Sequence, residues 1–279
     1  MKKAYFNSGA LSVAGFLVLG FLVLGFLFSG IVLADEKPQA ESTDAAQTAK
    51  PLAAIIVSDD HYHADTLFPE MVPWLEENYG IRTVIIHGHG GGDFENMERL
   101  KEADVALLFI RRIAPKTEQL AIFREYLESG RPLIAFRTSS HAFSLSFDGK
   151  KQPEPGFSEW REFDGEVLGG NYHNHGPNDA GTDVVTLPVA KDHPIFAGVE
   201  TEPYHSAGSL YFTLPIDEKA VLFQTGTVNG RTEPLTWLRK NEWGGTVLYS
   251  GLGHWEDFKD PRFQKMIGNA ILFLSREKK

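Results

Sequence analysis

The sequence predicts an α/β fold with a doubly wound, mostly parallel sheet. Short apolar runs rich in β-branched residues alternate with segments whose apolar side chains recur at helical spacing. The expected strands are 52–58, 81–87, 103–110 and 131–137, and the expected helices are 65–79, a short one in the mid-90s and one from Pro115 through Leu127. Strands and helices that alternate at this spacing are typical of βαβ units around a parallel sheet.

Local signals support each of these elements in turn. The run LAAIIVS at 52–58 is apolar throughout, as expected for a strand buried on both faces, and Asp59 ends it. Residues 65–79 then show the helical period. Pro115 suits the first turn of a helix, and Gly130 suits its end.

The second half of the domain begins with a long polar segment, 138–182, which contains one expected helix near 157–168. A loop of that length in a compact domain is usually functional or an insertion. The later expected elements are strands at 182–189, about 208–213, 220–226, 233–239 and 244–251, and a final helix at about 260–276.

The N-terminal part differs in character from the rest of the chain. Residues 1–34 carry two lysines and then a long apolar run that ends in Val32-Leu33-Ala34, which predicts a signal peptide or an N-terminal membrane anchor. Residues 35–50 predict a disordered linker. We therefore expect an exported protein, periplasmic or extracellular, with one α/β domain at 51–279.

The charge and cysteine content exclude several functions. Without residues 1–34 the net charge is −12, which argues against nucleic acid as a partner and suits a neutral or cationic small ligand. The membrane is expected as a partner only through an uncleaved N-terminal segment. The chain has no cysteine, so disulfides, thiolate catalysis and cysteine-type zinc sites are excluded.

Polar side chains gather after the predicted strands. Ligands of open α/β sheets bind beyond the carboxyl ends of the strands. The residues expected there are Asp59, Asp60, His61 and His63 after the first strand, His87 and His89 after the second, Arg111 and Arg112 after the third, Ser139, Ser140 and His141 after the fourth, and His254, Trp255 and Glu256 after the last. Separate segments thus bring histidines to one edge, which favours histidine acid/base chemistry because imidazole titrates near neutrality.

Six of the ten histidines lie in H-x-H pairs, at 61–63, 87–89 and 173–175. Three histidines with a water molecule make a catalytic zinc site, so a zinc-dependent hydrolase is one alternative. A serine nucleophile at Ser139 or Ser140 is another, although the flanking glycines of a nucleophile elbow are missing.

Several blocks resemble the trehalose-utilisation ThuA-like family. They are FRTSSHAF at 136–143, GGNYHNHG at 169–176, HPIFAGV at 193–199, EPYHSAGSLYF at 202–212 and the long block at 234–273 that contains LGHWEDF. The resemblance covers nearly all of 51–279. It implies a flavodoxin-like, three-layer sandwich similar to class I glutamine amidotransferases.

The resemblance also implies carbohydrate metabolism, with glycosides or oxidised sugars as the substrate class. Amidotransferase chemistry is not expected, because no cysteine is present at the elbow near Ser139. We expect His141 and His254 as acid/base residues. We expect substrate contacts from Asp60, His61, Arg111, Ser139, His175, His205 and Trp255, and no metal ligand. A carbohydrate-binding domain without catalysis is the remaining alternative.

Overall fold

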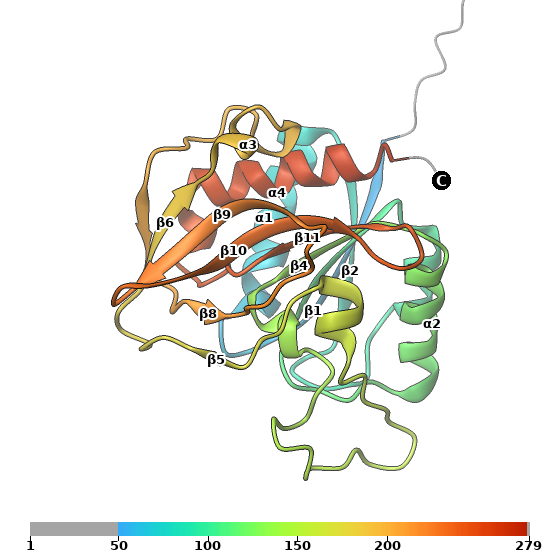
Figure 1. Ribbon diagram of the computed structural model, residues 1–279. Helices are drawn as coiled ribbons and strands as arrows, with labels where there is room; N and C mark the ends of the chain where they lie inside the picture. The colour runs from blue at the N-terminus through green and yellow to red at the C-terminus, as the bar shows by residue number, and fades with distance from the viewer. Residues whose placement is uncertain (1–49, 278–279) are drawn as a thin grey trace, which may run out of the picture. The chain divides into compact units, whose positions relative to one another are not determined.

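The computed structural model describes residues 50–277, so the segments predicted as a signal peptide or anchor and most of the predicted linker lie outside the described residues. A nine-stranded mixed sheet, in the order β2-β1-β3-β4-β11-β10-β9-β6-β7, forms the centre of this part (Figure 1). The predicted α/β fold is confirmed. No helix among residues 50–277 is long and apolar enough to cross a membrane.

Five neighbouring strands, which include the four predicted in the first half of the chain, are parallel. They are β1 (Leu52–Ser58), β2 (Arg82–His87), β3 (Val105–Ile110), β4 (Leu133–Phe136) and β11 (Thr246–Ser250). Strands β1, β3, β4 and β11 are buried along their whole length, because helices cover both faces of the sheet. Their carboxyl ends therefore lie along one edge.

The rest of the sheet is antiparallel and is built from β6 (Thr182–Thr186), β7 (Tyr204–Ser206), β9 (Val221–Val228) and β10 (Arg231–Lys240). A separate two-stranded sheet pairs β5 (Asn174–His175) with β8 (Tyr211–Phe212). The strand predicted at about 208–213 is thus β8, which lies outside the main sheet. β5 and β7 are too short to give a sequence signal.

Alternate residues of each parallel strand enter two separate cores. Ala53, Ile55 and Val57 of β1 face α1 (Ala64–Tyr79) and α4 (Pro261–Leu274), whereas Ala54 and Ile56 face the layer with α2 (Thr117–Glu128). Figure 1 shows α2 and α4 on opposite sides of the sheet. A short helix, α3 (Pro188–Lys191), packs near β9. Helix, sheet and helix make the three layers.

The long segment after β4 is mostly irregular. The helix predicted near 157–168 is only a π-helical turn at Asp164–Leu168. Trp160 and Phe163 precede that turn and are buried against the α2 layer, together with Trp237 of β10. The apolar residues that suggested a helix therefore anchor a loop to the core.

Candidate functional site

A left-handed residue follows each of the first four parallel strands. His63 (φ 60°) comes after β1, His89 (φ 49°) after β2, Arg112 (φ 46°) after β3 and Arg137 (φ 43°) after β4. Non-glycine residues are rare in this region of backbone space, and such strained residues cluster at functional sites. The carboxyl edge of the parallel strands is therefore the candidate location of a functional site.

Arg137 lies at the centre of this edge and is buried. Its guanidinium group donates hydrogen bonds to the Gly251 carbonyl (2.9 Å), the Tyr62 hydroxyl (3.2 Å) and the Ser209 hydroxyl (3.2 Å). It also lies between two aromatic rings, 4.3 Å from the centroid of Tyr62 and 4.7 Å from that of Tyr211. Cation–π contact and hydrogen bonds hold this buried charge in place.

The carboxylate of this edge belongs to Asp59. Its oxygens accept hydrogen bonds from the Tyr62 amide (2.8 Å) and the Thr138 hydroxyl (2.7 Å). Burial raises the pKa of the Asp59 carboxyl above 3.8, and the two donors oppose that rise. Asp60, which we predicted as the substrate contact, is exposed to solvent.

His141 lies beside Arg137 and stacks on Tyr172, with 4.5 Å between the ring centroids. The Ser140 hydroxyl lies 3.1 Å from its Nδ1 and donates to the Arg137 carbonyl at 3.1 Å. Because the Ser140 hydroxyl proton is used in the bond to the Arg137 carbonyl, Ser140 can only accept from His141. The ring proton of neutral His141 is therefore assigned to Nδ1, and Nε2 keeps its lone pair. Burial, followed by the charges of the neighbouring arginines, holds the pKa of His141 well below 6.5.

A cavity of about 560 Å³ opens next to His141. Its lining combines aromatic, hydroxyl and acidic side chains: Ser140, His141, Ser144, Ser146, Phe147, Arg161, Glu162, Asp164, Glu166, Asn171 and Tyr172, with Gly165 and Gly170. We call this space the His141 cavity. Its volume lies within the range of small-molecule sites, roughly 300–1,000 Å³.

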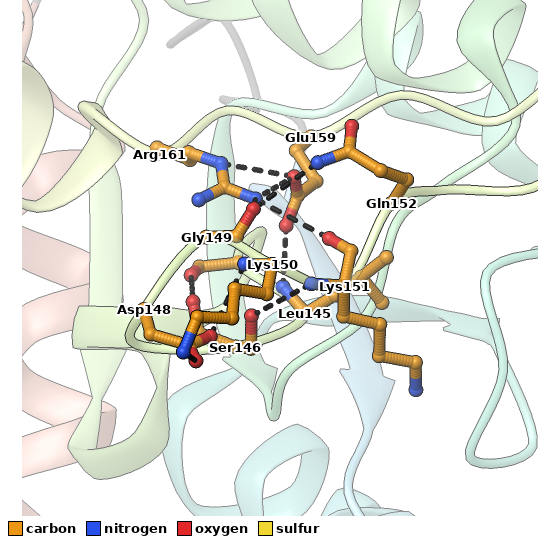
Figure 2. A network of polar contacts seen from close by, with 10 residues as sticks. Leu145, Ser146, Asp148, Gly149, Lys150, Lys151, Gln152, Glu159 and Arg161 are labelled. Carbon is orange, nitrogen blue, oxygen red and sulfur yellow. Dashed lines mark hydrogen bonds and ion pairs between the residues drawn. The ribbon is translucent and has the colours of Figure 1, made fainter.

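Phe147 stands at the wall of the His141 cavity and is 64% exposed. The loop that carries it is folded around Arg161, as Figure 2 shows. Arg161 pairs with Glu159 and also donates to the Gly149 and Lys151 carbonyls, while Glu159 accepts from the Leu145 amide. These contacts fix a loop that has little apolar burial of its own.

Asp164 opens the π-helical turn and fixes the opposite wall. Its Oδ2 accepts a hydrogen bond from the Tyr172 amide (2.6 Å), while its buried Oδ1 has no hydrogen-bond partner within residues 50–277. Burial raises the pKa of Asp164 to about 7. Asp164 therefore positions Tyr172, and through it the stack on His141.

His254 lies on the other side of the Arg137 stack. Its ring is 6.0 Å from that of Tyr62 and 3.7 Å from that of Trp255. Asp257 accepts hydrogen bonds from the Gly253 and His254 amides (2.8 and 2.9 Å), which fixes the turn. Since Nδ1 of His254 accepts from the Glu256 amide (3.3 Å), the proton of the neutral ring lies on Nε2.

Three predicted residues lie near this edge on its exposed side. His61 contacts Tyr62, with 4.6 Å between the ring centroids, and Arg111 is exposed at the end of β3. Burial and the charge of Arg111 lower the pKa of His61 below 6.5. Trp255 is 38% exposed, its ring lies 3.7 Å from that of His254, and it lines a second cavity together with His63.

Three predicted residues are placed less favourably. Ser139 is fully buried and donates to the Leu108 carbonyl (2.7 Å), so a ligand does not reach its hydroxyl. His205 lies on β7, in the antiparallel part of the sheet, and pairs with Asp183 at 2.8 Å. His175 is exposed, 6.2 Å from the Tyr211 ring, with Nδ1 at 2.7 Å from the Gly176 carbonyl.

The histidine pairs do not converge on a metal site. Among residues 50–277, no group of three or more histidine, aspartate or glutamate side chains is placed to hold one ion. His87 and His89 stack at 3.9 Å but have no third ligand there. The zinc alternative therefore has no ligand set in the described part of the chain.

Sequence reasoning missed the residues at the centre of the edge. Arg137, Tyr62 and Tyr172 did not stand out, although two of them lie within four residues of a strand end. Arg112 was expected after the third strand, but nothing in the sequence gave it a role. Asp59 was visible directly after β1, but nothing in the sequence separated it from Asp60. The signal in the sequence that could have identified most of these residues is their position at or just after the end of a predicted strand.

Comparisons with known proteins agree with this fold. The model of the ThuA family, described as trehalose utilisation, matches residues 53–274. A search of curated proteins finds no match. Among solved structures, a ThuA-like protein from Bacteroides uniformis is similar, with 17% identity, a TM-score of 0.60 and coverage of 84% of this chain and 95% of that chain.

Two further structures share the architecture. A ThuA-like protein from Parabacteroides merdae has 14% identity and a TM-score of 0.54, over 82% of this chain and 91% of its own. A β-galactosidase from Rahnella sp. R3 has 13% identity and a TM-score of 0.53, over 81% of this chain and 31% of its own. At such identities the likeness shows the fold alone.

Proposed function

Since the chain belongs to the ThuA family, we propose that it is an exported protein that binds and processes a carbohydrate through histidine acid/base chemistry at the His141 cavity. The family description, trehalose utilisation, supports the substrate class. Export rests on the sequence of residues 1–34. The observation that carries the proposal is the stacked, half-buried His141 beside a cavity of about 560 Å³.

His141 has the properties of a general base. Its lowered pKa keeps the imidazole neutral near pH 7, and the Ser140 contact leaves the Nε2 lone pair free. Among residues 50–277, no hydrogen bond occupies Nε2. A base of this kind abstracts a proton from a sugar hydroxyl or C–H group, or from a water molecule, within hydrogen-bond reach.

His254 has the complementary protonation. With its proton on Nε2, the neutral ring is a hydrogen-bond donor at the same edge. The stack of Tyr62, Arg137 and Tyr211 lies between the two histidines, so they do not contact each other. In this proposal His141 removes a proton, and His254 donates a hydrogen bond from the other side of the stack.

The aromatic surface suits a sugar. Phe147 and Tyr172 stack with 5.6 Å between their ring centroids, and both line the His141 cavity. Flat apolar faces next to hydroxyl and carboxyl groups match the C–H faces and hydroxyls of a pyranose. This arrangement supports carbohydrate binding independently of the family description.

The test is turnover of glycosides and oxidised sugars by the purified protein. His141→Ala is expected to lower the rate by about 10²–10⁴-fold, the usual contribution of a general base. His205→Ala, which removes an imidazole from the other part of the sheet, is the matched control and should keep the wild-type rate. Undiminished turnover by His141→Ala would falsify the assignment of the base.

A carbohydrate-binding domain without catalysis is the second candidate. One observation favours it: the elbow position holds Ser139, whose hydroxyl is buried and bonded to the Leu108 carbonyl. Saturable sugar binding with no turnover of any bound sugar would support this reading over the enzyme.

A further inference from the structure

Three arginines stand at the carboxyl edge without a carboxylate partner. Arg111, Arg112 and Arg137 form no ion pair within 4 Å with any acidic group of residues 50–277. Elsewhere in the same range, five arginines pair with acids, namely Arg99, Arg161, Arg231, Arg239 and Arg262, whereas Arg82, Arg124, Arg131 and Arg276 do not. The charges of Asp59 and Asp257 act on Arg111 and Arg137 from beyond that distance, so no carboxylate of the described residues directly occupies these guanidinium groups.

Two of these arginines keep a buried donor that is unpaired within residues 50–277, Nη1 of Arg112 and Nε of Arg137. Arg137 is fully enclosed, so Arg112 is the one of the two that a ligand can reach. Its guanidinium carbon lies 3.7 Å from the centroid of the Phe147 ring, which holds the planar group in one orientation. An unpaired buried donor is costly, more so on a charged group, and an acceptor on a ligand would satisfy it.

Arg137 has a different part in this arrangement. Its three hydrogen bonds and the two rings of Tyr62 and Tyr211 enclose the guanidinium group. It contributes charge to the edge but has no face open to a ligand. Arg111, by contrast, is exposed and close enough to Arg112 to lower its pKa, after burial, which is the larger cause.

We infer that the carbohydrate bound at this edge carries an anionic group, a carboxylate or a phosphate, and that Arg112 and Arg111 bind this group next to His141. The inference rests on the proposed function and adds the charge of the substrate to it. Guanidinium groups suit both anions, because their parallel N–H groups match two oxygens. The positive charge of these arginines is opposite to the net charge of −12 on the chain without residues 1–34, so they attract an anionic ligand that the net charge repels.

The arrangement also links ligand charge to the base. Burial lowers the pKa of His141 most, and the charges of Arg112, Arg111 and Arg137 lower it further. A bound anion offsets these charges, so the proton affinity of His141 rises when the ligand is present. His141 is then better able to accept a proton from the bound substrate than in the free protein.

Calorimetric binding of D-glucuronate, D-glucose 6-phosphate, D-glucose and inorganic phosphate to the full-length protein tests the inference. We expect at least one of the two anionic sugars to bind ten-fold or more tightly than glucose, and the tighter of the two identifies the group. Raising the salt concentration to about 0.5 M should reduce that preference, because the screening length shortens. Equal binding of glucose and the anionic sugars, or no binding of either, overturns the inference.

Arg112→Met keeps the aliphatic stem and removes the charge, so the preference for the anionic sugar should disappear. Arg124→Met is the matched control. Arg124 lies on α2 and also stacks on an aromatic ring, with its guanidinium carbon 3.6 Å from the centroid of Trp160. Should Arg112→Met fail to fold, Arg112→Lys keeps the charge without the paired N–H groups and should lose part of the preference. A preference that survives both Arg112 variants contradicts the assignment.

The same measurements separate this inference from the proposed function. If glucose binds and is processed, and Arg112→Met changes nothing, the sugar-processing function stands and the anion site falls. If inorganic phosphate binds through Arg112 as tightly as the anionic sugars, and no sugar is processed, the anion site stands and the sugar function falls.

Discussion

The imidazole of His141 stacks on the phenol of Tyr172, with 4.5 Å between ring centroids and 21° between ring planes. The two residues come from different segments, one directly after β4 and the other from the loop that follows the π-helical turn. The contact connects His141, the histidine of this edge whose pKa is lowered most, to Tyr172 in the aromatic wall of the His141 cavity. The protonation of His141 is therefore the first property to measure.

We expect the His141 ring to titrate below pH 6.5. Its lowered pKa means that the unfolded chain binds a proton more readily than the folded protein does. The stability it contributes is therefore lost as the pH falls below about 6.5. NMR titration of the imidazole resonances, with His141→Gln to assign the peak, measures the midpoint; a value at or above 6.5 contradicts the electrostatics described here.

Asp164 should act on stability in the opposite direction. Its folded-state pKa is raised from 3.8 to about 7, so its contribution is present below about pH 4 and is lost as the pH rises through 7. Asp164→Asn keeps an oxygen for the Tyr172 amide and cannot ionise. It should stabilise the protein by about 1 kcal/mol or more at pH 8, because one pKa unit corresponds to about 1.4 kcal/mol.

Urea unfolding of the wild type and Asp164→Asn at pH 5 and pH 8 measures how the stability difference between them changes with pH. Asp179→Asn removes an exposed charge and serves as the control. If Asp164→Asn is no more stable than the wild type at pH 8, the carboxyl is not buried as described.

Replacing Arg137 should destabilise the fold as well as the site. Arg137→Met removes three hydrogen bonds from a buried charged group and leaves the Gly251 carbonyl without its donor. Hydrogen bonds to charged groups contribute about 1.5–3 kcal/mol each, so we expect a loss of about 3 kcal/mol in the free energy of unfolding. Denaturant unfolding measures it, with Arg124→Met as the control; a loss below about 1 kcal/mol contradicts the central position of Arg137.

Alanine substitutions of two phenylalanines, Phe68 and Phe147, should affect stability and sugar binding differently. Phe68 of α1 is fully buried and contacts the rings of Phe258 (5.0 Å) and Phe136 (5.7 Å), so Phe68→Ala should destabilise the protein by about 3–5 kcal/mol. Phe147 is 64% exposed, and Phe147→Ala should change stability by about 1 kcal/mol or less.

The two variants should behave oppositely in binding assays. Phe147→Ala removes the ring under Arg112 and a wall of the His141 cavity, so it should weaken sugar binding although it folds normally. Equal sugar affinity for wild-type protein and Phe147→Ala would show that the bound sugar does not use this wall.

The sequence alone determined the parallel part of the sheet. The strands at 52–58 and 103–110 are apolar on both faces because helices cover both sides, and that property is visible in single segments. It also predicted a site at the carboxyl edge, since parallel strands align their ends. The antiparallel extension was less visible, because its outermost strand, β7, has only three residues.

Only the tertiary structure decided which residues of that edge are buried and which line a cavity. Asp59 is buried and accepts a hydrogen bond from Thr138, 79 residues away in the chain, whereas its neighbour Asp60 is exposed. Ser139 is buried against Leu108, while its neighbour but one, His141, opens to a cavity whose other wall comes from the loop around Tyr172. Side-chain direction after a strand depends on such long-range contacts and on left-handed backbone at residues such as Arg112 and Arg137, which no local pattern encodes.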